Sequence, residues 1–155
     1  MNARLRNLRG LSKRWSRPKV VLIEDDRNML TLLDTFLELE GFEVVQIGDD
    51  ENLNGAELYR LIQQEKPDLV LMDVYLNQVD GMDGFDLLRR LRCAPKTSGM
   101  RILMSSGMDV KDKCKQEGAS GFIMKPYMPE ELLLKIKQTL DINWPLGLDR
   151  LLRVY

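Results

Sequence analysis

Four sets of polar residues in this sequence have the types needed for phosphoryl chemistry, and each follows a short apolar run. They are the acid pair Glu24 and Asp25, the carboxylate of Asp73, the hydroxyl of Ser105 and the ammonium of Lys125. A carboxylate can act as a nucleophile toward a phosphoryl group. Carboxylate oxygens also select hard ions such as Mg²⁺, which takes one or two carboxylates together with water and phosphate oxygens. Metal, ammonium and hydroxyl would then each hold one phosphoryl oxygen.

The apolar runs before these residues have the length and bounding turn residues of buried strands. With one further run they cover residues 20–23, 43–47, 69–72, 102–104 and 122–124. Between and after them, apolar residues recur at helical spacing, which predicts five helices. Strands that alternate with helices predict an α/β fold with a doubly wound parallel sheet. At this length the commonest arrangement is flavodoxin-like, with strand order 2-1-3-4-5.

This strand order predicts which polar residues are neighbours. Adjacent strands lie ~4.8 Å apart, so Asp73 has the acid pair on one side and Ser105 on the other. Lys125 starts ~10 Å away, a distance that an extended lysine can largely cover. The central place of Asp73 favours it as the nucleophile. Three carboxylates close together need a compensating cation, and Mg²⁺ is the simplest one.

Composition excludes several other chemistries. The chain has no histidine, which rules out Ser/His and Cys/His nucleophile pairs, a phosphohistidine carrier and most zinc sites. Cys93 and Cys114 have no metal spacing and fit free thiols in a reducing, cytoplasmic compartment. A formal net charge of −1 does not suggest a nucleic-acid binder. No apolar run is long enough for a transmembrane segment.

The length of 155 residues predicts one domain, at 19–141. Residues 1–18 form a basic extension without acids. It is either an amphipathic arm for an acidic partner, membrane surface or nucleic acid, or a solvated terminus. Residues 142–155 form a tail that could pack back as a short helix.

Over about 19–140 the sequence resembles the receiver domain of two-component response regulators. The motifs that carry this resemblance are Val-Leu-Ile-Glu-Asp-Asp at 21–26, Leu-Val-Leu-Met-Asp at 69–73, Asp-Gly-Phe at 83–85, Met-Ser-Ser-Gly at 104–107 and Lys-Pro-Tyr at 125–127. In this order and spacing they are highly specific.

The resemblance implies that Asp73 accepts a phosphoryl group from a histidine kinase or a histidine phosphotransfer protein. Asp25 and Asp73 would ligate Mg²⁺ directly, with Glu24 acting through water. The backbone carbonyl of Tyr75 would be a further ligand. By the same resemblance the chain is no enzyme in the usual sense and only catalyses its own phosphorylation and slow dephosphorylation.

The resemblance also implies a conformational switch. Lys125 and Ser105 would contact the phosphoryl group, and the peptide bond between Lys125 and Pro126 would be cis. Ser105 would move toward the phosphoryl group and leave space for the switch aromatic, Phe122. The surface of the fourth helix, the fifth strand and the fifth helix would then bind a downstream protein or a second copy. We expect no DNA-binding domain in this chain.

The loop after Asp73 departs from the family pattern, because it is longer and lacks the usual proline. Tyr75 is a bulky neighbour of the phosphorylation site, so we predict that it slows attack by water. An aspartate-nucleophile phosphatase of the haloacid-dehalogenase type is one alternative, but it would have an Asp two residues after the nucleophile, where Tyr75 stands. The other alternative is a receiver-like binding module that is not controlled by phosphorylation.

Overall fold

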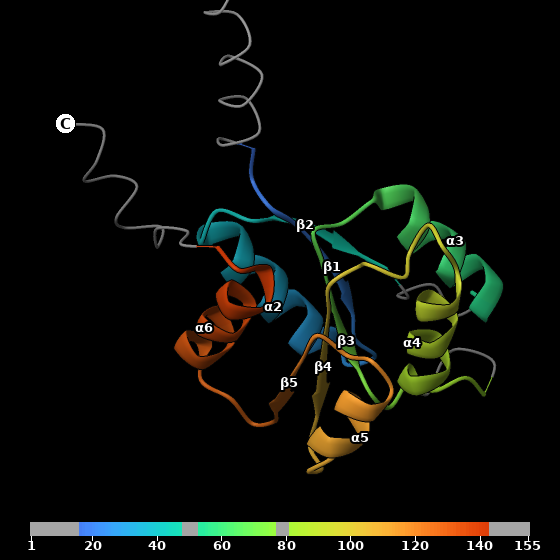
Figure 1. The fold of residues 1–155 in the computed structure, drawn as a ribbon. Helices are drawn as coiled ribbons and strands as arrows, with labels where there is room; N and C mark the ends of the chain where they lie inside the picture. Colours follow the sequence, from blue (N-terminus) through green and yellow to red (C-terminus); the bar gives the residue numbers. More distant parts are fainter. Residues whose placement is uncertain (1–15, 48–52, 77–80, 143–155) are drawn as a thin grey trace, which may run out of the picture.

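Five parallel strands form the centre of the fold in the order β2-β1-β3-β4-β5 (Figure 1). The computed structural model describes residues 16–47, 53–76 and 81–142. The strands are β1 (Lys19–Ile23), β2 (Glu43–Gln46), β3 (Leu69–Asp73), β4 (Ile102–Ser106) and β5 (Gly121–Met124). The predicted strand order is therefore confirmed. β4 continues through both serines, two residues beyond the apolar run 102–104 that the sequence predicts as this strand.

Five helices in the described part of the chain cover the two faces of this sheet. They are α2 (Arg27–Leu39), α3 (Gly55–Glu65), α4 (Gly84–Cys93), α5 (Lys111–Gln116) and α6 (Pro129–Leu140). α2 and α6 lie on one face, and α3, α4 and α5 lie on the other (Figure 1). This is the doubly wound arrangement that the alternation of strands and helices predicted.

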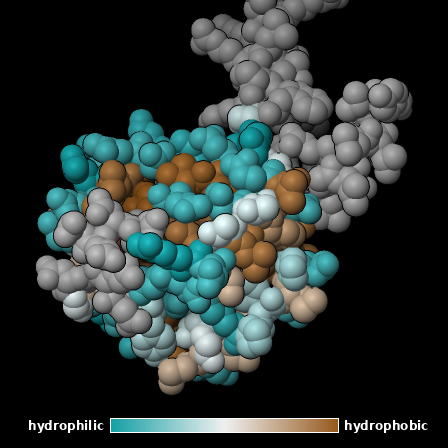
Figure 2. Space-filling model, turned by 180° about the vertical axis from the view of Figure 1, so that it is seen from behind, coloured by the Kyte–Doolittle hydropathy of each residue, from teal (hydrophilic) through white to brown (hydrophobic). Residues whose placement is uncertain are grey.

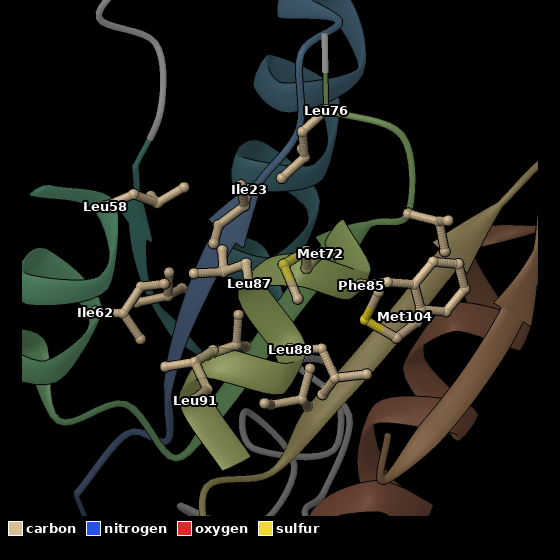
Figure 3. Packing of buried hydrophobic residues seen from close by; sticks show 14 of the residues in the cluster. Ile23, Leu58, Ile62, Met72, Leu76, Phe85, Leu87, Leu88, Leu91 and Met104 are labelled. Atoms are coloured by element: carbon tan, nitrogen blue, oxygen red, sulfur yellow. The ribbon is translucent and has the colours of Figure 1, made fainter. Parts of the chain in front are cut away.

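The two faces of β3 show why its sequence is apolar throughout. Leu69 and Leu71 belong to the buried cluster under α2 and α6, whereas Val70 and Met72 belong to the cluster under α3, α4 and α5. Successive side chains of a strand point to opposite faces, so a strand covered on both sides needs a continuous apolar run. In Figure 3, leucines of α4 lie over β1 and β3.

Arg92, near the end of α4, connects three segments on the α5 side of the sheet. Its Nε donates a hydrogen bond to the carbonyl of Gly118, at 2.7 Å, and its Nη1 donates to the carbonyl of Met100, also at 2.7 Å. Its Nη2 donates to Oγ of Ser120 at 3.2 Å. One guanidinium thus holds the start of β4 and the turn between α5 and β5.

The residues before β1 are attached to the domain from Arg17 onward. Arg17 donates hydrogen bonds to the carbonyls of Gly41 and Phe42 and forms an ion pair with Glu38, with 2.5 Å between Nη2 and Oε2. At the other end, α6 stops at Leu140. The predictions for the basic residues 1–15 and for the tail 143–155 concern residues outside the described part.

The surface view from behind shows hydrophobic patches set among a mostly hydrophilic surface (Figure 2). Within the described residues, no helix has both the length and the apolar character required to span a bilayer. In an open parallel sheet of this kind, ligands bind at the carboxyl ends of the strands, so the candidate site is sought there.

Candidate functional site

Lys125 joins the ends of three strands. Its Nζ donates hydrogen bonds to Oε2 of Glu24, at 2.6 Å, and to Oδ2 of Asp73, at 3.0 Å. Glu24 follows β1, Asp73 ends β3 and Lys125 follows β5. These three residues are far apart in sequence, and the sheet brings them to one edge, as their positions at strand ends predicted.

The charge state of Lys125 follows from this pairing. Burial works against the ammonium, but the hydrogen bonds that Lys125 donates to Glu24 and Asp73 outweigh it and raise the pKa of Lys125. The lysine is therefore protonated at neutral pH, and its positive charge offsets the two carboxylates. Both acids are well covered, since the side chain of Glu24 is 7% exposed and that of Asp73 is 14% exposed.

Asp73 is fixed by the backbone on both of its sides. Its Cα is paired in register with that of Ser105, and its Oδ1 accepts a hydrogen bond from the backbone N–H of Tyr75 at 3.2 Å. The start of α4 lies directly against this strand end, because the N–H of Gly84 donates to the carbonyl of Val74 at 2.7 Å. A Cβ at Gly84 would overlap the Asp73 carbonyl oxygen and would lie 2.9 Å from the Cα of Val74.

The three acids after β1 have different surroundings. Asp26 caps α2, because its Oδ1 accepts hydrogen bonds from the N–H groups of Asn28 and Met29. Glu24 accepts from the N–H of Asp26, at 3.2 Å, in addition to its bond with Lys125. Asp25 lies between them and is partly exposed.

We tested whether these residues suit a magnesium ion. Among the described residues, no three acid, cysteine or histidine side chains are close enough to form a metal cage. The sequence predicts three carboxylates with Mg²⁺ as their counter-charge, whereas the structure places the Lys125 ammonium between Glu24 and Asp73. Asp25 and Asp73 still provide hard oxygen donors at one edge. Such a pair suits an open Mg²⁺ site completed by water and phosphate oxygens.

Ser105 is almost fully buried at the end of β4, with 2% of its surface exposed. Its hydroxyl has no hydrogen-bond partner among the described residues, and the same holds for the buried hydroxyl of Tyr127. In the sequence Tyr127 appears only as the last residue of the Lys-Pro-Tyr motif. No spacing rule pointed to it, because it lies beyond the end of β5.

Two exposed side chains meet beside the Asp73 end of the sheet. The hydroxyl of Tyr75 donates to Sδ of Met108 at 3.6 Å. Tyr75 is 45% exposed and Met108 is 60% exposed. They come from the segments that follow β3 and β4, the two strands that contain Asp73 and Ser105. The backbone carbonyl of Tyr75 stays a predicted metal ligand.

Phe122 lies in β5, in register with Met104, and packs against the cluster under α3, α4 and α5. It is partly buried, whereas Ser105 follows Leu103 of the cluster under α2 and α6 by two positions and therefore faces the other side of the sheet. The peptide bond between Lys125 and Pro126 is cis, as predicted.

Comparison with known proteins agrees with this geometry. Residues 20–137 match the family described as response regulator receiver domain. The phosphate regulon transcriptional regulatory protein PhoB of Rhizobium meliloti is 34% identical over 139 residues, which are 88% of this chain and 58% of that protein. The chain spans a little over half the length of the curated relatives it matches.

Two solved structures share the fold. The chemotaxis response regulator CheY4 of Vibrio cholerae has a TM-score of 0.68 at 24% identity, over 80% of this chain and 99% of that one. The receiver domain of a sensor histidine kinase from Pseudomonas aeruginosa has a TM-score of 0.68 at 19% identity, over 82% of this chain and all of that one. That second structure is described with a magnesium ion coordinated in its active-site cleft.

Proposed function

Because the chain belongs to the family of response regulator receiver domains, we propose that Asp73 accepts a phosphoryl group from a histidine kinase or a histidine phosphotransfer protein. The observation that carries this assignment is the bridge from Lys125 to Glu24 and Asp73, with Ser105 next to Asp73 in the sheet. A nucleophilic carboxylate, a fixed ammonium and a buried hydroxyl are thereby gathered at one place.

The transfer proceeds from phosphohistidine to aspartate. An oxygen of Asp73 forms a bond with phosphorus while the phosphorus–nitrogen bond of the donor breaks and the imidazole leaves with the bonding electron pair and takes up a proton. Lys125 donates a hydrogen bond to one phosphoryl oxygen, and the Ser105 hydroxyl donates a hydrogen bond to another. These contacts stabilise the charge that spreads over the phosphoryl oxygens.

Asp25 and Asp73 would hold Mg²⁺, with Glu24 acting through water and the Tyr75 carbonyl as a further ligand. When bound, the ion neutralises charge on the phosphoryl oxygens. In the unphosphorylated chain Lys125 has the corresponding role, because its positive charge compensates the negative charges of Glu24 and Asp73. The domain therefore acts as a signalling switch that catalyses only its own modification.

Phosphorylation adds about −1.5 to −2 units of charge and three acceptor oxygens. Ser105 turns toward this group. Phe122, in the neighbouring strand β5, changes the position of its side chain in response. The output surface is formed by α5, β5 and α6, which carry the exposed side chains of Met124 and Leu134 beside a groove of about 380 Å³. A downstream protein or a second copy of the chain binds there, with different affinity for the two states. We place this exchange in the cytoplasm, in keeping with the free cysteines Cys93 and Cys114.

The test is to incubate the chain with Mg²⁺ and phosphoramidate and to record the intact mass. We expect the wild type to gain one phosphoryl group, and chelation of Mg²⁺ to prevent it. Asp73→Asn should gain none, whereas Asp68→Asn, an acid at the opposite end of β3, should behave like the wild type. A wild type that never gains the group acts as an unphosphorylated binding module, and continuous release of phosphate from many esters indicates a phosphatase. Either result overturns the proposal.

A further inference from the structure

Helix α2 carries two apolar stripes, and one of them continues onto the surface of the domain. The inner stripe is buried in the cluster under α2 and α6 and consists of Leu30, Leu33 and Leu37. The outer stripe also follows helical spacing, and its members are Met29, Leu32, Phe36 and Leu39. Leu32 is 63% exposed and Leu39 is 74% exposed. A continuous apolar stripe at the surface, along the whole length of a helix, indicates an interaction surface.

The first part of the outer stripe forms one wall of a groove. This groove has a volume of about 180 Å³ and lies between α2 and the start of α6. Met29, Leu32 and Phe36 line it on the α2 side, and Pro129 lines it on the α6 side. Among the described residues that line it, Lys125 alone is charged. An apolar groove beside a helix suits an amphipathic helix as its occupant.

The chain enters the domain at the opposite end of the outer stripe. Arg17 donates a hydrogen bond to the carbonyl of Gly41 and forms its ion pair with Glu38, near the end of α2. Glu38 is the immediate neighbour of Leu39 in the sequence. Residues 1–15, called the arm below, are therefore tethered beside the last member of the outer stripe.

The arm complements the outer stripe in its apolar pattern, its charge and its length. Its apolar residues at nearly helical spacing are Leu5, Leu8, Leu11 and Trp15. It has five basic residues and no acid, whereas the end of α2 and its cap have no basic residue and carry the acids Asp34, Glu38 and Glu40. At 1.5 Å per residue, a helical arm would span about 22 Å and the outer stripe spans about 15 Å.

We propose that the arm docks as an amphipathic helix along the outer stripe of α2, with its leucines over the stripe and the groove and its basic side chains beside the acids of α2. A helix of this length is marginal when isolated in water, so burial of the two apolar stripes against each other stabilises it. The docked arm extends from its tether at Arg17 to the groove that Lys125 lines. This inference goes beyond the proposed function and requires no phosphoryl group.

The tail at 143–155 is a competing occupant for the same surface. It follows Ile142, which packs against the cluster under α2 and α6, and it contains several leucines. It has two basic residues and one acid, so its charge complements the acids of α2 less well than that of the arm. The arm is therefore the better match.

Tryptophan fluorescence of the full chain tests the docking, because the two tryptophans are Trp15 in the arm and Trp144 in the tail. In a Trp144→Phe background we expect Trp15 to emit at short wavelength and to be shielded from acrylamide. Leu32→Gln or Leu39→Gln should shift its emission to longer wavelength, since the loss of one buried leucine lowers the docking equilibrium constant about tenfold. The matched control is Leu134→Gln, on the β5 side of α6 and 57% exposed, which should leave the emission unchanged.

Three further measurements complete the test. The substituted leucines are exposed, so each variant should keep the strand and helix content of its parent by circular dichroism. Salt at about 1 M shortens the screening length to about 3 Å and should shift the emission of Trp15 in the same direction as the α2 variants. A solvent-exposed Trp15 in the parent chain, or an emission that the α2 variants do not change, overturns the inference. It is also overturned if Trp144 responds to these variants in a Trp15→Phe background, which identifies the tail as the occupant, or if the shift depends on chain concentration, which identifies a second copy.

Discussion

The phenol of Tyr75 and the thioether of Met108 form a contact of 3.6 Å between the segments that follow β3 and β4. A thioether is a weak acceptor, so this bond alone holds the two segments loosely. The two side chains nevertheless stand beside Asp73, whose Oδ1 is bonded to the backbone of Tyr75 itself. We therefore expect their bulk to obstruct water that approaches a phosphorylated Asp73 from solvent.

Tyr75→Ala should shorten the lifetime of the phosphorylated chain, because it opens this path to water. We expect dephosphorylation to accelerate by up to about tenfold, which corresponds to about 1.4 kcal/mol in the barrier. Decay of the phosphorylated form after removal of donor is followed by intact mass. Tyr75→Phe keeps the ring and loses only the bond to Met108, so its decay should stay close to that of the wild type. An alanine variant that decays no faster would remove the idea.

Lys125→Met should destabilise the free chain, because it leaves Glu24 and Asp73 without their shared cation. We expect a loss of about 2 kcal/mol in the free energy of unfolding, measured by urea titration. Added Mg²⁺ should stabilise this variant more than the wild type, since the ion then supplies the missing charge.

The control for that variant is Lys19→Met. Lys19 also bridges two acids, Glu43 at 3.4 Å and Glu65 at 3.3 Å, but these acids are more exposed than Glu24 and Asp73, with 51% and 36% of their side chains accessible. Its loss should cost less than about 1 kcal/mol and should not respond to Mg²⁺. If both variants lost the same free energy of unfolding and responded alike to Mg²⁺, the Lys125 bridge would contribute no more to stability than a surface ion pair.

Gly84→Ala should disturb the end of β3, because the added Cβ overlaps the backbone of Asp73 and Val74. We expect a destabilisation of about 2 kcal/mol and slower phosphorylation, as the start of α4 is pushed away from Asp73. Gly99→Ala is the matched control, since no atom lies within 4 Å of a Cβ there; its effect should stay within about 0.5 kcal/mol. Similar urea midpoints for both variants would contradict the close approach.

The ion pair of Arg17 and Glu38 predicts a dependence of stability on pH. The Arg17 guanidinium and the Val44 N–H lower the pKa of Glu38 below its ordinary value of 4.5. A lowered pKa in the folded chain means that the contribution is present above pH 4.5 and is lost as the pH falls below it. Because both side chains are 42% exposed, we expect only about 0.5 kcal/mol.

The comparison for this pair is Glu38→Gln against the wild type, by urea unfolding across pH. The two free energies should differ near neutral pH and converge in acid. In an Arg17→Met background the glutamine should make little difference at any pH. A difference that persists in acid, or one that survives without Arg17, would assign it to another cause.

The parts of the site that follow from chain topology could be predicted from the sequence. Glu24, Asp73 and Lys125 each end an apolar run, and the order of a parallel sheet with right-handed crossovers then brings them to one edge. The prediction was less accurate where two chemical solutions compete. A row of acids needs positive charge, and sequence alone does not say how far this comes from a metal ion or from a lysine that reaches across two strands.

The apolar run also underestimated the length of β4. The run ends at residue 104, with Ser105 expected at the strand end, yet both Ser105 and Ser106 are buried within the strand. Their burial depends on the neighbours that β3 and β5 provide, which no window of sequence contains. Tyr127 was missed for a similar reason, since the burial of its hydroxyl arises only from the packed fold.

The hydrogen bonds that Arg92 donates to Gly118, Met100 and Ser120 determine which parts of α5 can move when the phosphorylation site changes. It fixes the C-terminal end of α5, while the N-terminal end is connected to the segment that follows Ser105 and Ser106. A displacement applied at the N-terminal end of α5 should therefore rotate the helix about its fixed C-terminal end. A small shift of the serine should therefore reappear as rotation of α5, largest beside Met108 and least at the arginine.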